Sequence, residues 1–162
     1  MSKAPLLNRE VDLVLLSIEM TKQARHVQRC WSIIKQLQQA RIDYPEEINI
    51  SLGFYRTVFD SLVTSVFIDL GKLYDQSGDS YSLYALQQLL GGLYGRSEQA
   101  SALKNQSQSL RALFPKAQAL RQWRNKQYAH NAQEIEWARA KLDSEYPLKD
   151  EDIESLIAFA CE

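Results

Sequence analysis

Hydrophobic residues recur at spacings of three and four along almost the whole chain, which is the pattern of amphipathic helices. The alternation of polar and apolar positions that is typical of strands is absent, and glycine and proline are scarce, at 6 and 4 residues. The pattern therefore predicts an all-α protein. The expected helices cover residues 8–40, 48–75, 82–90, 97–109 and 116–130, and a last one begins near residue 149.

Residues with strong local preferences set the expected ends of these helices. Asn8 is a good N-cap residue, Tyr44-Pro45 should end or restart the first helix, and Gly91-Gly92 should stop the third. The second helix carries 13 apolar residues between positions 52 and 74, and they spread over most of its circumference. A helix that is apolar on most sides is usually buried. We therefore expect this second helix to be the central, most buried one.

The chain has 162 residues, about the length of one average domain, and we expect a single domain over residues 1–162. No apolar run approaches the roughly 18 residues that a membrane span needs. The N-terminus also lacks the basic and then apolar layout of a secretory signal, so we expect a cytoplasmic protein that does not associate with membranes. Cys30 and Cys161 could form at most one disulfide, and free thiols are the expectation.

The formal net charge of −1 conceals an uneven distribution of charge. Residues 99–133 contain six basic residues and no acidic one, whereas residues 134–162 contain three basic and nine acidic residues. A segment without acids produces a positive field that attracts phosphate groups. Charge alone favours a simpler interpretation, in which the acidic C-terminal segment folds against the basic one and neutralises it.

Two short patterns resemble ligand sites but lack essential residues. His26 and Cys30 lie four apart on one helical face, which gives two ligands where a zinc site needs more. The glycines of residues 91–95 are neither preceded by a strand nor followed by the Gly-Lys-Ser/Thr of a phosphate-binding loop. We therefore expect no metal and no other cofactor. Arg56 and Asp60, four apart on the second helix, could form a buried pair that supports a site, but a plain structural salt bridge is favoured.

The second histidine, His130, belongs to a helix in which charged residues flank the apolar stripe. On a helical wheel centred on Leu120, Trp123 continues the stripe, while Arg124 and His130 lie about 40° and about 80° to its two sides. Charged groups beside buried residues lose solvation, which is unfavourable unless they find partners. This placement indicates either a hydrogen-bonded interface or a functional site.

Arginine and histidine are suited to the cleavage of an RNA phosphodiester. A base must take the proton of the 2′-hydroxyl, an acid must protonate the leaving oxygen, and positive charge must stabilise the phosphate in the transition state. Histidine titrates near neutrality, and arginine binds phosphate through two hydrogen bonds. Arg124 and His130 are about 9 Å apart along one helix and about 120° around it, so one helix supplies both groups only with difficulty. Two such helices in a two-fold dimer would form a composite site.

The heptapeptide Arg124-Asn125-Lys126-Gln127-Tyr128-Ala129-His130 resembles the signature of the HEPN superfamily, in which an arginine and a polar residue precede a histidine that follows four to six intervening positions. The earlier elements, an aromatic-rich helix over residues 54–75 and a short serine-led helix at Ser82-Leu83, resemble the abortive-infection branch of that superfamily. The resemblance covers about residues 10–160. It implies an up-and-down bundle of four to five main helices that dimerises.

The resemblance also implies a function: a metal-independent endoribonuclease of a prokaryotic toxin–antitoxin or phage-defence system, with a composite active site at a homodimer interface. Arg124 matches the arginine that contacts the phosphate, His130 matches the catalytic histidine, and Asn125 matches the polar residue that orients them. Lys126 and Arg121 are added from the charge distribution alone, as candidate contacts to the RNA backbone. The expected partners are RNA, a second copy of the chain and a cognate antitoxin such as a small nucleotidyltransferase.

A non-enzymatic alternative remains open. Some members of the superfamily keep the fold and lose catalysis, and this chain would then be an inactive HEPN-like helical module that binds a partner protein or a nucleotide. In that case Arg124 and His130 would stabilise a dimer interface through hydrogen bonds. Cleavage of RNA by the wild-type protein separates the two hypotheses.

Overall fold

The computed structural model describes residues 6–77, 81–128 and 143–162, and it gives side chains for residues 10–77, 81–125 and 143–162. The regular elements in these ranges are helices, which confirms the predicted all-α fold. None of them is long and apolar enough to cross a membrane. In chain order the helices are α1 (Leu6–Asp43), α2 (Pro45–Ile50), α3 (Leu52–Leu73), α4 (Leu83–Tyr94), α5 (Ala100–Ala112), α6 (Phe114–Tyr128) and α8 (Asp150–Cys161).

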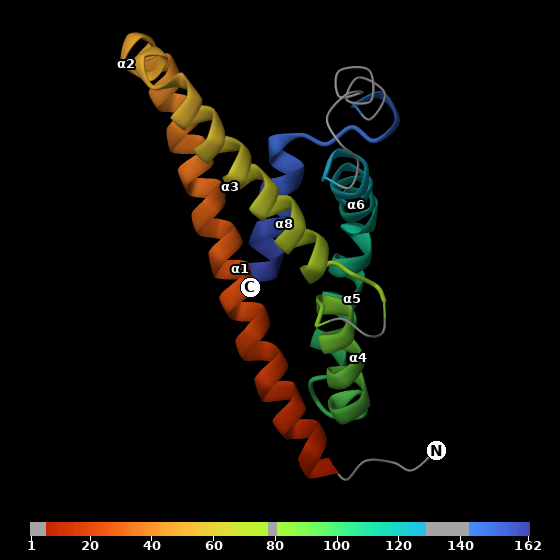
Figure 1. Ribbon diagram of the computed structural model, residues 1–162. Coiled ribbons are helices and arrows are strands. Elements are labelled where there is room, and N and C mark those ends of the chain that lie inside the picture. The colour runs from red at the N-terminus through yellow and green to blue at the C-terminus, as the bar shows by residue number, and fades with distance from the viewer. Residues whose placement is uncertain (1–5, 78–80, 129–142) are drawn as a thin grey trace.

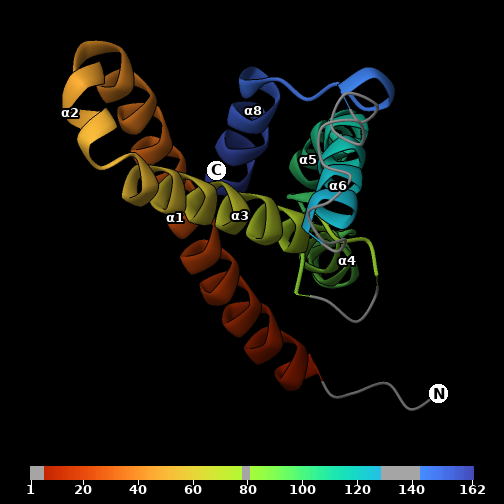
Figure 2. The same cartoon turned by 45° about the horizontal axis from the view of Figure 1, so that its top comes forward.

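The first three helices form a long hairpin, and the other helices pack against one part of it (Figure 1). The long helix α1 contacts α2, α3, α4 and α8, while α3 returns beside it in the opposite direction. The short helix α2 lies at the far tip of the hairpin, away from α4, α5 and α6. Figure 2 shows that α3 crosses α1 and reaches α6 with its C-terminal end. This crossing places α6 against the end of α3, where α6 also contacts α8.

The hydrophobic core lies where α1, α6 and α8 meet the C-terminal half of α3. Burial of one large aliphatic side chain stabilises the folded state by about 1.5–3 kcal/mol relative to leaving it exposed. The packing therefore fixes α6, the helix with most of the predicted site, against α3. The most fully buried side chains of these four helices are Val27 and Ile34 of α1, Val66, Leu70 and Leu73 of α3, Leu120 of α6 and Leu156 of α8.

The hairpin contains one more helix break than the sequence predicted. The first helix begins at Leu6, so Asn8 lies inside it rather than at its N-cap. The chain restarts after Tyr44 as α2, with Pro45 in the first turn, where its missing N–H is tolerated. A second break at Ser51 separates α2 from α3, so the single helix expected over residues 48–75 is in fact two.

The helix α4 is longer than predicted. Its start is confirmed, because the Ser82 side chain accepts a hydrogen bond of 3.3 Å from the backbone N–H of Ala85. It continues through Gly91-Gly92 to Tyr94, because neither glycine adopts the left-handed conformation that would end a helix. The later helices α5, α6 and α8 begin and, where described, end within three residues of their predicted positions.

The helix α3 is buried mainly in its C-terminal half. Its buried residues, apart from Tyr55, lie between Val66 and Leu73, while Phe54 in its first turn is 74% exposed. Because the hairpin extends beyond the other helices, nothing in the described chain covers this end of α3 on its outer sides. Arg56 and Asp60 are both exposed there and form no ion pair with each other, so the expected salt bridge is absent.

Two groups of apolar side chains on this hairpin are exposed to solvent. The first group, which we call the α1 stripe, lies on the face of α1 that is turned away from the core, and its members are 46–58% exposed: Val11, Val14, Leu15 and Ile18. The second group, the hairpin tip, is 58–85% exposed: Ile42, Tyr44, Ile50 and Phe54. Grouped exposure of large apolar side chains marks surfaces that bind other molecules.

Candidate functional site

The apolar stripe of α6 determines which side chains of this helix face α3. Leu120 is fully buried and Trp123 is 7% exposed, as the helical wheel predicted. The ring centroid of Trp123 lies 6.4 Å from that of Phe67 on α3, and its Nε1 donates a hydrogen bond of 2.9 Å to the carbonyl oxygen of Tyr146. These contacts fix the rotation of α6 and bring Arg124 to the edge of the contact with α3.

Arg124 passes over α3 at Gly71, where the helix has no side chain. Its Cδ and Nη1 atoms each lie 3.0 Å, and its Nε atom 3.5 Å, from the position that a Cβ atom on residue 71 would occupy. The Nε atom donates a hydrogen bond of 3.2 Å to Oδ1 of Asn125. The Arg124 side chain is therefore half-buried between α3 and Asn125, the residue expected to orient it.

Asp75 adds a negative charge just beyond the C-terminal end of α3. Its Oδ1 accepts a hydrogen bond of 3.0 Å from the backbone N–H of Ser77. This hydrogen bond, and more weakly the positive charges of Arg121 and Arg124, hold the pKa of Asp75 below its ordinary value. The carboxylate is therefore ionised at neutral pH, and together with the carbonyl end of α3 it favours cations at this place. Neither arginine comes close enough to Asp75 to form an ion pair.

The acid-free segment, residues 99–133, is neutralised only in part by the rest of the described chain. Lys116 forms an ion pair of 3.0 Å with Asp152 of α8 and donates a hydrogen bond to Ser155, as the simpler interpretation of the charge pattern predicts. Four other basic residues form no ion pair with any residue that the structure describes: Lys104, Arg111, Arg121 and Arg124. The result is an excess of positive charge on α5 and α6.

The structure places three of the five predicted site residues close together on α6 beside the C-terminal end of α3: Arg121, Arg124 and Asn125. The remaining two predictions cannot be compared with it. His130 lies outside the described residues, and so does the side chain of Lys126. The predicted grouping on the described part of α6 is therefore present, and its relation to His130 stays a prediction.

Sequence reasoning missed two residues of this group, Gly71 and Asp75. A lone glycine inside an otherwise continuous helical pattern is a signal of close approach by another group, and Gly71 is such a residue. Asp75 gave no comparable signal, because its proximity to Arg121 and Arg124 depends on the crossing of α3 and α6. Both residues come from α3 or its end, about fifty positions before the motif.

His26, the histidine outside the heptapeptide, lies in a polar cluster between α1 and α3. Its Nε2 atom lies 3.1 Å from Oγ of Ser65, 3.6 Å from Sγ of Cys30 and 3.8 Å from Oδ2 of Asp69. Burial raises the pKa of the Cys30 thiol, and both Cys30 and Cys161 are free, as predicted. Among the described residues no group of three or more potential ligands could hold a metal ion. The contacts of His26 with Ser65 and Asp69 link α1 to α3.

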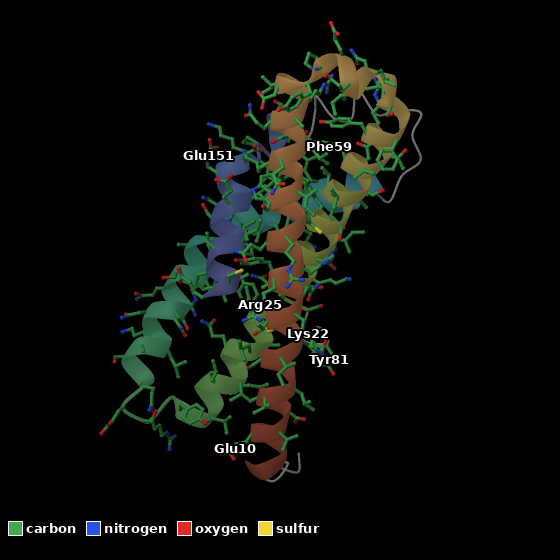
Figure 3. All side chains as sticks on the ribbon, turned by 90° about the vertical axis from the view of Figure 1, so that its left-hand side faces the viewer. Glu10, Lys22, Arg25, Phe59, Tyr81 and Glu151 are labelled. Carbon is green, nitrogen blue, oxygen red and sulfur yellow. The ribbon has the colours of Figure 1, made fainter. Side chains whose placement is uncertain are left out.

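A hollow of about 510 Å³ lies between α1, α4, α5 and α8, and it is separate from the group around Arg124. Leu86 of α4 and Phe159 of α8 contribute apolar surface to it, and Arg25 of α1 contributes a positive charge. Figure 3 shows Arg25 on the side of α1 that faces α4, α5 and α8, with α3 on the other side of α1. No described residue of α3 or α6 lines this hollow.

Comparison of the chain with known protein families identifies a helical family, in agreement with the all-α fold. The family model of AbiU2, a HEPN family, matches residues 10–162, which includes every helix described above apart from the first residues of α1. No curated protein and no solved structure matches the chain. The superfamily that the heptapeptide indicated and the abortive-infection branch that the earlier helices indicated are thereby confirmed. The chain belongs to the AbiU2 family of HEPN domains, a family associated with abortive infection.

Proposed function

We propose that this AbiU2-family chain is a metal-independent endoribonuclease that acts as a homodimer in phage defence or in a toxin–antitoxin system. Arg124 holds the scissile phosphate, Asn125 orients Arg124, and His130 transfers protons. Arg121 and Lys126 bind neighbouring phosphates of the RNA backbone. The activity would be directed against RNA during infection, and a cognate antitoxin such as a small nucleotidyltransferase would restrain it.

The observation that carries this proposal is the environment of the Arg124 guanidinium group. The group is half-buried and bound to Asn125 through Nε, but no described residue forms an ion pair with it or accepts a hydrogen bond from Nη1 or Nη2. An arginine that only stabilises the fold usually acquires a carboxylate partner when it loses hydration. A guanidinium group that is oriented through Nε, with no described acceptor at Nη1 or Nη2, is suited to bind a phosphate with two hydrogen bonds.

The proposed reaction explains why two copies of the chain are required. One histidine takes the proton of the 2′-hydroxyl as the 2′-oxygen attacks phosphorus, and a second, protonated histidine gives a proton to the 5′-oxygen as its bond to phosphorus breaks. The products are a 2′,3′-cyclic phosphate and a 5′-hydroxyl, while Arg124 stabilises the charge that gathers on the phosphate. The chain has only two histidines, and His26 lies in the cluster between α1 and α3. The second histidine of the site must therefore be His130 of another copy.

RNA cleavage by the full chain in the presence of EDTA tests the proposal. Each of the changes Arg124→Ala and His130→Ala should abolish cleavage while the far-ultraviolet circular dichroism stays that of a helical protein. Two matched controls should cleave at nearly the wild-type rate: Arg111→Ala, an exposed arginine of the same acid-free segment, and His26→Ala, the other histidine. Undiminished cleavage by the Arg124 and His130 variants, or loss of activity in EDTA, would contradict the proposal.

Mixing the wild type with an excess of the inactive His130→Ala chain tests whether the site is composite. A dimer of one wild-type chain and one His130→Ala chain has only one of the two histidines that the proposed reaction needs. The excess variant should therefore suppress cleavage by the wild-type chains. If each chain carried a complete site, cleavage per wild-type chain would stay unchanged in the mixture.

A second function, the binding of a partner protein by an inactive module, is favoured by a different observation. The hairpin tip exposes four large apolar side chains far from α6, where they serve no purpose in RNA cleavage. Under this function the wild-type protein cleaves no RNA. The paired changes Ile50→Ser and Phe54→Ser would then abolish the binding of the partner protein, measured by isothermal titration calorimetry, whereas Arg111→Ala would not.

A further inference from the structure

We propose that Gly71 is a positioning residue: because it has no side chain, Arg124 can lie against α3 and present its guanidinium group in one direction. This inference rests on the proposed function, in which that guanidinium group binds the phosphate of RNA. It assigns a role in the site to a residue of α3 that lies far from the motif in the sequence.

The backbone gives no reason for a glycine at position 71. The residue lies inside the helix α3, and no glycine that the structure describes has a positive φ. Glycine weakens a helix interior relative to alanine, since it loses more conformational freedom on folding. Its neighbours Leu70 and Leu73 are fully buried, so the segment is well packed on its other faces. A residue that weakens a buried helix must therefore be explained by what approaches it.

The side chain of Arg124 supplies that explanation. The distances of 3.0 Å from Cδ and Nη1 to an added Cβ atom are shorter than the roughly 3.5–4.0 Å of an ordinary contact between carbon atoms. A methyl group at position 71 would therefore displace the guanidinium group and strain the hydrogen bond from Nε to Asn125. By contrast, nothing lies within 4 Å of a Cβ atom added at Gly53 or Gly91. Among the described glycines, close approach by a side chain occurs at Gly71; at Gly95 the near atom is the backbone oxygen of Gly91, one turn earlier.

Thermal unfolding of four proteins tests the contact itself: the wild type, Gly71→Ala, Arg124→Ala and the double variant. Alanine in place of glycine ordinarily raises the Tm of a helical protein. We expect Gly71→Ala to raise the Tm only in the Arg124→Ala background, where the space is free. The matched change Gly91→Ala should raise the Tm equally in both backgrounds. An equal gain from Gly71→Ala in both backgrounds would overturn the proposal.

Binding of RNA tests the role in the site. The probe is a fluorescent 2′-O-methyl RNA, which cannot be cleaved because the attacking hydroxyl is blocked, and its affinity is read from fluorescence anisotropy. Gly71→Ala should weaken binding severalfold, because the guanidinium group must move by a few tenths of an ångström, and it should cause no further loss in the Arg124→Ala background. The Gly91→Ala control should bind like the wild type.

The two measurements separate the failure of this inference from the failure of the proposed function. Wild-type affinity in Gly71→Ala, when the wild type itself binds the probe, would overturn the positioning role. A wild-type protein that binds no RNA would overturn the proposed function, and the unfolding data would still decide whether Gly71 makes room for Arg124.

Discussion

The hydroxyl group of Tyr74, between Gly71 of α3 and Asp75 just beyond it, joins this end of α3 to the last helix. Its OH donates a hydrogen bond of 2.7 Å to the carbonyl oxygen of Leu156 in α8, and the residue is only 6% exposed. The change Tyr74→Phe removes this one oxygen and keeps the ring. It is therefore a narrow test of whether α8 is attached to the site through this contact.

The expected loss of stability depends on the hydrogen bonds that remain once the Tyr74 hydroxyl is removed. A net loss of about 1 kcal/mol is typical for one buried hydrogen bond, and a carbonyl left wholly without a partner adds to it. The carbonyl of Leu156 lies inside α8, so it keeps its helical hydrogen bond and the added cost is small. We expect Tyr74→Phe to lower the free energy of unfolding by about 1–1.5 kcal/mol, which corresponds to a Tm lower by roughly 3–5 °C for a domain of this length.

The burial of Tyr74 also predicts that the free energy of unfolding falls at alkaline pH. Burial raises the pKa of Tyr74 well above its ordinary value, so in the unfolded chain the group ionises first, near pH 10. Its contribution to stability is complete below that pH and is lost as pH rises towards the raised pKa of the folded state. The wild type should lose about 1.4 kcal/mol by about pH 11 through this group, and the Phe variant should lose none. The difference between the two proteins should therefore vanish near about pH 11.

Urea unfolding followed by circular dichroism at about pH 8 and about pH 11 measures both effects. Tyr81→Phe is the matched control, because Tyr81 is 73% exposed and its removal should change little at either pH. A Tyr74→Phe variant as stable as the wild type at pH 8 would refute the structural contact. A stability difference that stayed constant up to pH 11 would refute the reasoning from burial.

Three further predictions concern the supports of the site and the thiols. Trp123→Phe removes the hydrogen bond to Tyr146 and should destabilise the protein by about 1–3 kcal/mol in urea unfolding; an unchanged midpoint would contradict this anchoring of α6. The Lys149 backbone N–H and the Lys116 ammonium group hold the pKa of Asp152 below its ordinary value, so its stabilising effect is present above pH 4 and is lost as pH falls through the lowered pKa. Asp152→Asn should therefore be less stable than the wild type at neutral pH and equally stable near pH 2, by thermal melts; a gap that persists in acid would argue against the ion pair. Ellman's reagent should modify one thiol per native chain, the exposed Cys161, and two in urea, so fast labelling of the buried Cys30 would contradict the packing of α1.

Much of the fold could be predicted because helix formation depends on local sequence. The spacing of apolar residues located α1, α4, α5, α6 and α8 to within a few residues at most of their ends. The start of α4 was equally local, since Ser82 caps the helix with its own side chain. The heptapeptide from Arg124 to His130 was sufficient to indicate the HEPN superfamily, which the match to AbiU2 confirms.

Other features depended on which helices meet, and these the sequence did not reveal. The break at Ser51 and the continuation of α4 through Gly91-Gly92 were not predicted, because the residues concerned are compatible with either outcome. The apolar residues of the second helix spread around its circumference, yet Phe54 is exposed because the hairpin projects beyond the other helices. Burial is a property of the assembled helices, so a pattern along one helix cannot establish it.

The candidate site shows the same division. The sequence by itself determined that Arg124 lies beside the buried stripe of its helix, with Asn125 next to it in the chain, because positions three and four apart share a helical face. Only the tertiary structure decided that Arg124 lies over Gly71 and near Asp75, because this contact requires α3 to cross α6 at one particular residue. Helical periodicity fixes the rotation of a helix about its own axis. Where two helices touch is set by the packing of all their side chains at once.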